Sequence, residues 1–224
     1  MHATKTAPAE THFVKMLAPS PSAPPPSMPA YIIPAAAAGL GILALILAYA
    51  QAILRGDQQP GITNLPDITH CVLKQPERGL FLTLFMPACM CMAGSWGLGA
   101  ARSPTAWKLG LVACGLLIMG EAMLDEHPNW TLHTIGASGF FLFSMIAECL
   151  RAWQSGGEQP GSLTAKKVVA VFNVTVIVID LVLALTKQPG WTQNLCEWIA
   201  AFSVVAYHAI FAVDLSAARI TLVA

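Results

Sequence analysis

Six long apolar stretches occupy most of this 224-residue chain, and each is long enough to cross a lipid bilayer. They cover residues 30–54, 79–100, 106–124, 131–153, 167–186 and 191–220. A membrane-spanning helix needs about 20 mainly apolar residues, with a rise of roughly 1.5 Å per residue. The sequence therefore predicts an all-α fold, an integral membrane bundle of six transmembrane helices.

The composition argues against the other fold classes. Hydrophobic residues make up 55% of the chain, charged residues make up 11%, and the mean hydropathy is +0.61. A soluble helix has one polar face, whereas residues 34–50 are apolar on all sides. A transmembrane β-barrel needs a two-residue alternation that these continuous stretches lack. With a net charge of zero and no basic run, no nucleic-acid partner is expected.

Three parts of the chain follow from this pattern. Residues 1–29 are rich in proline and alanine, so we expect a tail with little secondary structure. Residues 30–224 form the six-helix transmembrane domain, and residues 55–78 form its longest connection, an outer loop. The first apolar run is long for a secretory signal, so we expect it to stay in the protein as an uncleaved span.

Lysine and arginine are distributed unevenly around the spans. Eight of them fall on the side that holds both termini: Lys5, Lys15, Arg102, Lys108, Arg151, Lys166, Lys167 and Arg219. Four fall on the opposite side: Arg55, Lys74, Arg78 and Lys187. Because positively charged loops stay in the cytoplasm, we expect both termini to be cytoplasmic.

Several ionisable residues lie inside or at the edge of the spans. Each costs at least about 2.5–3.5 kcal/mol on membrane-insertion scales, so each predicts an interior position and a partner. The predicted topology places them in the outer half of the membrane, beneath the 55–78 loop and its own charged residues. Together they form a candidate outer polar pocket, which consists of Asp67, His70, Glu77, Arg78, Glu121, His133, Asp180 and Glu197.

Helical spacing supports this convergence. A stripe on the fourth span begins at His133 and ends at Glu148, and a similar stripe on the sixth span runs from Glu197 to Phe211. We therefore expect His133 and Glu197 to face the bundle interior. The prolines of the outer loop limit its freedom, and its apolar residues favour burial. We expect it to fold back so that Glu77 or Arg78 approaches the outer ends of the third, fourth or sixth spans.

Two interpretations of this cluster remain open. In one, His133, Arg78 and backbone donors satisfy Glu121, Asp180 and Glu197, and these charges only lock the bundle. In the other, the cluster is an outward-opening pocket for a lipid head group or for proton transfer. No metal-binding spacing, nucleophile elbow or phosphate-binding glycine loop is present, so we predict no metal, cofactor or catalytic residue. A disulfide between Cys71 and Cys196, on one predicted side, is also left open.

Short motifs resemble a known family. Pro66-Asp67-Ile68-Thr69-His70, then Pro76-Glu77-Arg78 and Phe81, is similar to the first outer loop of the six-span DRAM-like proteins. The resemblance continues at residues 133–137 and in the last span, at residues 197–198, Phe202 and 211–214. That family includes damage-regulated autophagy modulators, phosphoinositide-linked relatives and GPI-anchor lipid-remodelling proteins. The chain departs from the expected pattern in Thr69, where serine is expected, and in its long tail.

The resemblance implies a lipid-associated regulatory or scaffold protein of an endomembrane or the plasma membrane. An organelle inner membrane also remains open. The expected partners are membrane lipids and other membrane proteins. The alternatives are an accessory subunit of a larger membrane complex and an enzyme acting on glycolipid acyl chains. In the enzyme, His133 would be the base, and Glu121 or Glu197 would orient it.

Overall fold

The computed structural model describes residues 27–56, 61, 64–124, 128–154, 160–188 and 190–221. Across these residues the chain forms seven helices and one two-stranded sheet. In order they are β1 (Ser27–Pro29), α1 (Ile32–Leu54), α2 (Ile68–Cys71), α3 (Glu77–Leu98), α4 (Pro104–Ala122), α5 (Trp130–Gln154), α6 (Pro160–Leu185), α7 (Gly190–Asp214) and β2 (Arg219–Thr221). In this part of the chain, all helices except α2 are long and apolar enough to cross a membrane, which confirms the six predicted spans.

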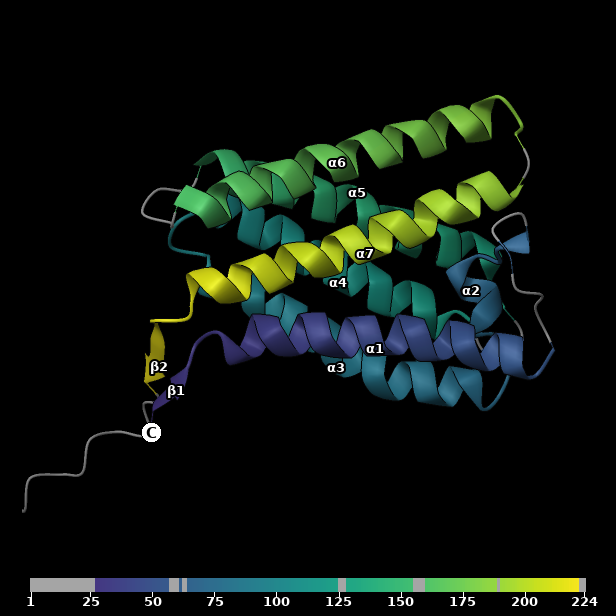
Figure 1. The fold of residues 1–224 in the computed structure, drawn as a ribbon, viewed down its shortest axis with the longest axis horizontal. Helices are drawn as coiled ribbons and strands as arrows, with labels where there is room; N and C mark the ends of the chain where they lie inside the picture. The colour runs from purple at the N-terminus through teal and green to yellow at the C-terminus, as the bar shows by residue number, and fades with distance from the viewer. Residues whose placement is uncertain are drawn as a thin grey trace, which may run out of the picture.

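The long helices lie side by side along one axis (Figure 1). Within this bundle α1 packs against α3 and α7, α4 packs against α5, and α6 packs mainly on α7 along one edge. Helix α2 lies at one end of the bundle, and β1 and β2 lie at the other. We call these two ends the α2 end and the termini end.

Two glycines bring α4 and α5 into close contact. A Cβ atom added at Gly136 would lie 2.5 Å from the Leu116 carbonyl oxygen and 2.6 Å from the Cα atom of Gly120. Only two residues without side chains allow the helix backbones to approach this closely. This crossing places the first turn of α5, which carries His133, against the last turn of α4.

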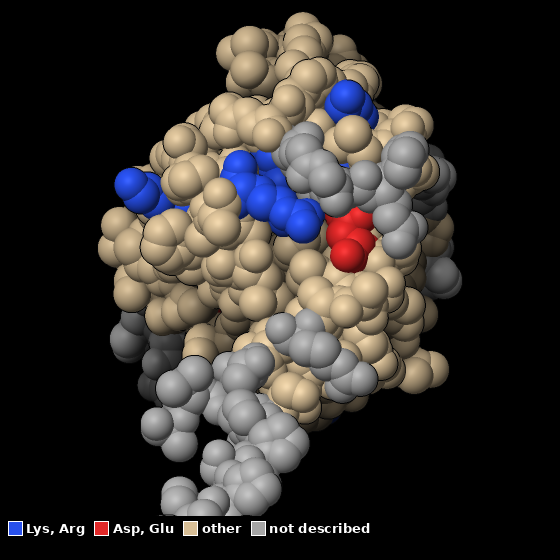
Figure 2. Space-filling view, turned by 90° about the vertical axis from the view of Figure 1, so that its left-hand side faces the viewer, with Lys and Arg blue, Asp and Glu red and all other residues tan. Residues whose placement is uncertain are grey.

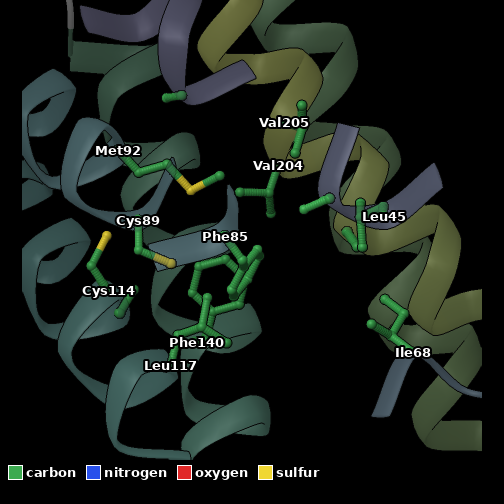
Figure 3. Close-up of a cluster of buried hydrophobic side chains, with 14 of the residues drawn as sticks. Leu45, Ile68, Phe85, Cys89, Met92, Cys114, Leu117, Phe140, Val204 and Val205 are labelled. Carbon is green, nitrogen blue, oxygen red and sulfur yellow. The ribbon is translucent and has the colours of Figure 1, made fainter. Parts of the chain in front are cut away.

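Apolar side chains from five of the long helices and from α2 fill the bundle centre (Figure 3). Phe85, Phe140 and Val204 point into the space between the helices. Leu45 and Ile68 lie on the right of this view, across the space from Met92 and Cys89. The all-apolar surfaces found in the sequence thus divide into a buried core and a lipid-facing exterior. Residues on that exterior, such as Ile46 and Leu181, are more than half exposed.

The ends of most spans fall within two residues of the predicted positions. The fifth span is the first exception, because α6 begins at Pro160 rather than at residue 167. Proline is favoured in the first helical turn, where its missing N–H has no helical partner. The last span ends at Asp214 rather than at residue 220, because residues 215–217 turn and residues 219–221 form β2.

Strands β1 and β2 close the termini end. They pair antiparallel, with Ser27 opposite Thr221 and Pro29 opposite Arg219. The backbone N–H of Ala30 also donates to the carbonyl of Ala218 at 3.0 Å. The last three residues of the predicted tail therefore join the folded domain. The rest of the tail, residues 1–26, lies outside the described residues.

Buried polar contacts hold the termini end together. Lys166 of α6 forms an ion pair with Asp214 of α7, and the Ser162 hydroxyl also donates to Asp214. Both charged side chains are almost fully buried, at 0% and 1% exposed. Further along the bundle, Asn173 of α6 donates to the Glu148 carboxylate of α5 at 3.0 Å. These contacts fix α6 to its two neighbours.

Candidate functional site

The connection between α1 and α3 folds back over the α2 end. The carboxylate of Asp67 accepts a hydrogen bond from the backbone N–H of His70 at 2.6 Å, which caps the N-terminus of α2. The indole N–H of Trp198 donates to the Pro66 carbonyl at 2.8 Å, and the Asn194 amide donates to the Leu65 carbonyl at 2.8 Å. Helix α7 therefore holds the segment before α2 in place.

A hydroxyl and an imidazole meet beneath α2. The Thr69 Oγ1 atom lies 2.9 Å from Nε2 of His133, and Nδ1 of His133 lies 3.1 Å from the Gly120 carbonyl oxygen. A carbonyl only accepts, so Nδ1 carries a proton, and in that tautomer Nε2 accepts from the Thr69 hydroxyl. The close crossing of α4 and α5 thus sets the tautomer of His133. The carbonyl of Gly120 orients this ring, rather than the expected Glu121 or Glu197.

Two carboxyl groups lie beside this pair. Glu197 Oε2 accepts a long hydrogen bond of 3.4 Å from the backbone N–H of Ile68. Glu121 is 6% exposed, and its Oε2 atom has no hydrogen-bond partner among the described residues. Arg78 Nη2 donates to the backbone carbonyl of Glu121 at 2.8 Å. Arg78 therefore reaches the end of the third span, as expected, but from the first turn of α3 and not from the loop.

Four of these side chains line a cavity of about 50 Å³ in the bundle. Its polar end consists of Thr69, Glu121, His133 and Glu197. Its walls are apolar and include the labelled core residues of Figure 3: Leu45, Ile68, Phe85, Met92, Leu117, Phe140, Val204 and Val205. Both His133 and Glu197 thus face the interior, as their helical spacing predicted. We call this space the inner cavity.

The other predicted site residues lie around the inner cavity rather than in it. Glu77 is buried and forms an ion pair with Arg55, at 2.7 Å between Oε1 and Nε. Asp67 and His70 pair with each other at 2.7 Å on the outside of α2. Asp180 lines a second cavity of about 140 Å³ between α5, α6 and α7, and Glu197 borders both cavities. The eight predicted residues therefore divide among four neighbouring groups.

The His70 ring stacks on Trp130 at 6.0 Å between ring centroids, on the outer surface of the α2 end. Across the described part of the chain, no three His, Cys, Asp or Glu side chains are placed to hold a metal ion. Cys71 and Cys196 are both free thiols. The structure therefore contains no disulfide between these two cysteines.

Cys71 lies in α2, outside the long helices, and is buried. Burial and, to a smaller extent, the neighbouring carboxyl groups of Asp67 and Glu197 together raise the pKa of its thiol from 9 to about 12. A thiol reacts as a thiolate, so this cysteine is poorly reactive at neutral pH. Cys71 therefore acts as a packing residue of the hydrophobic core.

The sequence alone did not identify Thr69 as a cavity residue. The visible signal was a capping aspartate at position 67 followed by a hydroxyl residue and a histidine, which is typical of a short helical turn. The contact with His133 joins residues 64 positions apart. No local pattern predicts it.

The comparisons with known proteins agree with this architecture. Residues 29–218 match the family described as the Frag1/DRAM/Sfk1/Cwh43P N-terminal domain. The match includes the six long helices, α2 and every residue of the inner cavity. No curated protein and no solved structure matches the chain. The chain therefore belongs to the Frag1/DRAM/Sfk1/Cwh43 family of integral membrane proteins.

Proposed function

We propose that this protein has a lipid-associated regulatory role and binds part of a membrane lipid in the inner cavity. The observation that carries the proposal is the unpartnered Glu121 Oε2 atom, which is buried in a cavity with apolar walls. Buried polar atoms are almost always hydrogen-bonded, so an unsatisfied one at a cavity favours a bound group. The surrounding solvent is lipid, which supplies both polar groups and acyl chains.

The chemistry of the cavity limits the ligand class. Its polar end presents carboxyl oxygens together with the Thr69–His133 pair, and these groups suit a hydroxyl more than a phosphate. One water molecule needs about 10–15 Å³, so a cavity of about 50 Å³ holds a few small groups and not a whole lipid. We therefore propose that a hydroxyl-bearing end of a lipid occupies the cavity.

Copurification tests this proposal. The protein is purified in mild detergent, and its bound lipids are compared by mass spectrometry with those of two variants. Glu121→Gln changes the hydrogen-bonding group, and Ala137→Leu fills part of the cavity; both should lower the amount of the enriched lipid. Ala50→Leu, in a groove between α1 and α7, is the matched control and should not. A wild-type protein with no enriched lipid would contradict the proposal.

We further propose that the termini end faces the cytoplasm. The support is the bias in lysine and arginine across the spans. Figure 2 views the termini end, where basic side chains gather beside a small acidic patch. Arg102 and Lys108 are exposed at this end. Protease protection of tagged termini in sealed vesicles tests the orientation, and a lumenal N-terminal tag would overturn it.

The Thr69–His133 contact favours one second candidate, an enzyme acting on the acyl chains of a glycolipid. In it, Thr69 Oγ1 attacks an ester carbonyl while His133 Nε2 takes the hydroxyl proton. The leaving lipid oxygen then takes that proton, and a second hydroxyl displaces the acyl group from Thr69. Mass spectrometry of Thr69 after incubation with a glycolipid tests this. An acyl adduct on wild type and Thr69→Ser, but not on His133→Gln, is expected; no adduct on wild type rejects the enzyme.

A further inference from the structure

A second cavity lies next to the inner cavity and shares a wall with it. It measures about 140 Å³ and is lined by residues of α5, α6 and α7. Phe141 and Glu197 border both cavities. We call the second space the side cavity and these two residues the partition. The side chains of the partition therefore lie between the two cavities.

The side cavity opens toward the lipid rather than toward water. Two of its lining residues, Ser138 and Leu142, are exposed on α5, and Leu142 is 46% exposed; we call these two residues the rim. Ser138 lies eight residues beyond Trp130, the first residue of α5, which corresponds to about 12 Å along the helix axis. A bilayer has a hydrocarbon core of about 30 Å, so an opening at this depth faces acyl chains.

The route through the end of the bundle is closed more firmly. Around α2, the side chains of His133, Asn194 and Trp198 form hydrogen bonds of 2.8–2.9 Å to the connecting segment. By contrast, the described residues in the α2-end halves of α5 and α6 form no side-chain hydrogen bond or ion pair with each other. A seam held only by apolar contacts opens at a lower cost than one held by several hydrogen bonds.

The polar residues of the side cavity also need an explanation. Asp180 is half-buried on α6, among apolar neighbours such as Val176 and Ile177. An ionisable group at this depth is costly and normally serves a function or has a partner. Ser138 and Glu197 line the same space. Ser138, Asp180 and Glu197 would offer hydrogen bonds to a hydroxyl-bearing group that passes through the side cavity.

We infer that a lipid reaches the inner cavity sideways, from the bilayer through the side cavity, when Phe141 and Glu197 move apart. This inference rests on the proposed lipid-binding function. Glu197 is suited to such movement because its bond to the Ile68 N–H is long, at 3.4 Å. The lipid hydroxyl then lies at the polar end of the inner cavity, and its chain passes through the side cavity into the bilayer.

Exchange kinetics test the route separately from binding. The full chain in detergent micelles is equilibrated with a diacylglycerol that carries a fluorescent acyl chain. The amount of labelled diacylglycerol that stays with the protein after affinity capture gives the equilibrium occupancy. Mixing with excess unlabelled diacylglycerol gives the release rate. The variant Ser138→Trp should obstruct the rim, and it should slow binding and release about tenfold while the occupancy stays the same.

Two further variants complete the test. Phe141→Ala removes half of the partition and should speed release, whereas Ala50→Trp, in the groove between α1 and α7, should leave the rate unchanged. Wild-type binding with equal release rates in wild type and Ser138→Trp would overturn the side route but not the binding proposal. No binding of the probe to the wild type would instead overturn the proposed ligand class. The two failures are therefore distinguishable.

Discussion

The hydroxyl of Thr69 lies 2.9 Å from Nε2 of His133, and this hydrogen bond ties the segment between α1 and α3 to α5. The other ring nitrogen of His133, Nδ1, forms a hydrogen bond of 3.1 Å to the Gly120 carbonyl of α4. Three parts of the chain thus meet at one imidazole. The inner cavity depends on this contact for its polar end.

Replacing Thr69 with valine should destabilise the protein, because it leaves a buried ring nitrogen without a donor. The loss of one such bond costs about 1–3 kcal/mol. Thr69→Ser keeps the hydroxyl and should unfold at nearly the wild-type temperature. Thermal unfolding in detergent measures both variants. Equal melting temperatures for Thr69→Val and wild type would mean that the contact contributes nothing to stability.

Adding a methyl group at Gly136 should separate α4 from α5. Its Cβ atom would lie 2.5 Å from a backbone oxygen, which cannot move without the whole helix. We expect Gly136→Ala to lower the free energy of unfolding by about 1–3 kcal/mol, as overpacking does elsewhere. Gly115→Ala is the control, because a Cβ there has no neighbour within 4 Å. If Gly136→Ala and Gly115→Ala unfold at the same temperature, the close crossing does not stabilise the packing of α4 on α5.

Breaking the buried Lys166–Asp214 pair should be strongly destabilising. Removal of one partner leaves the other charge buried and unpaired, at a cost of about 3–5 kcal/mol. Lys166→Met should therefore have a much lower melting temperature than wild type. The double variant Lys166→Met with Asp214→Leu should recover part of this lost stability. Lys167→Met, at a half-buried neighbouring position, serves as the control. A double variant no more stable than the single one would contradict this account.

Cys71 should react slowly with maleimide in the folded protein. At pH 8, a pKa of about 12 in place of 9 lowers the thiolate fraction about 1,000-fold. The reactive form is the deprotonated one, so the labelling rate should rise about tenfold per pH unit as the pH approaches 12. Mass spectrometry of labelled peptides follows this site, with unfolded protein as the control. Rapid labelling at pH 8 would show that α2 opens readily.

Much of the fold was determined by the sequence. Runs of about 20 apolar residues leave the backbone no way to satisfy its polar groups in lipid except as helices, so the number and approximate limits of the spans follow from composition. The inward faces of His133 and Glu197 follow from helical spacing and from the cost of an ionisable group facing lipid. These are local quantities, which each segment carries by itself.

The contacts between segments were decided by the tertiary structure alone. The eight predicted polar residues were expected in one pocket, but Glu77 pairs with Arg55, Asp180 lines the side cavity, and Thr69 joins His133. The hydrogen-bond partner of a buried polar group depends on which helices cross closely. The close crossing at Gly120 and Gly136 brings the Gly120 carbonyl to the His133 ring. Distances between segments far apart in the chain leave no periodic signal in the sequence, because they arise only when the helices pack.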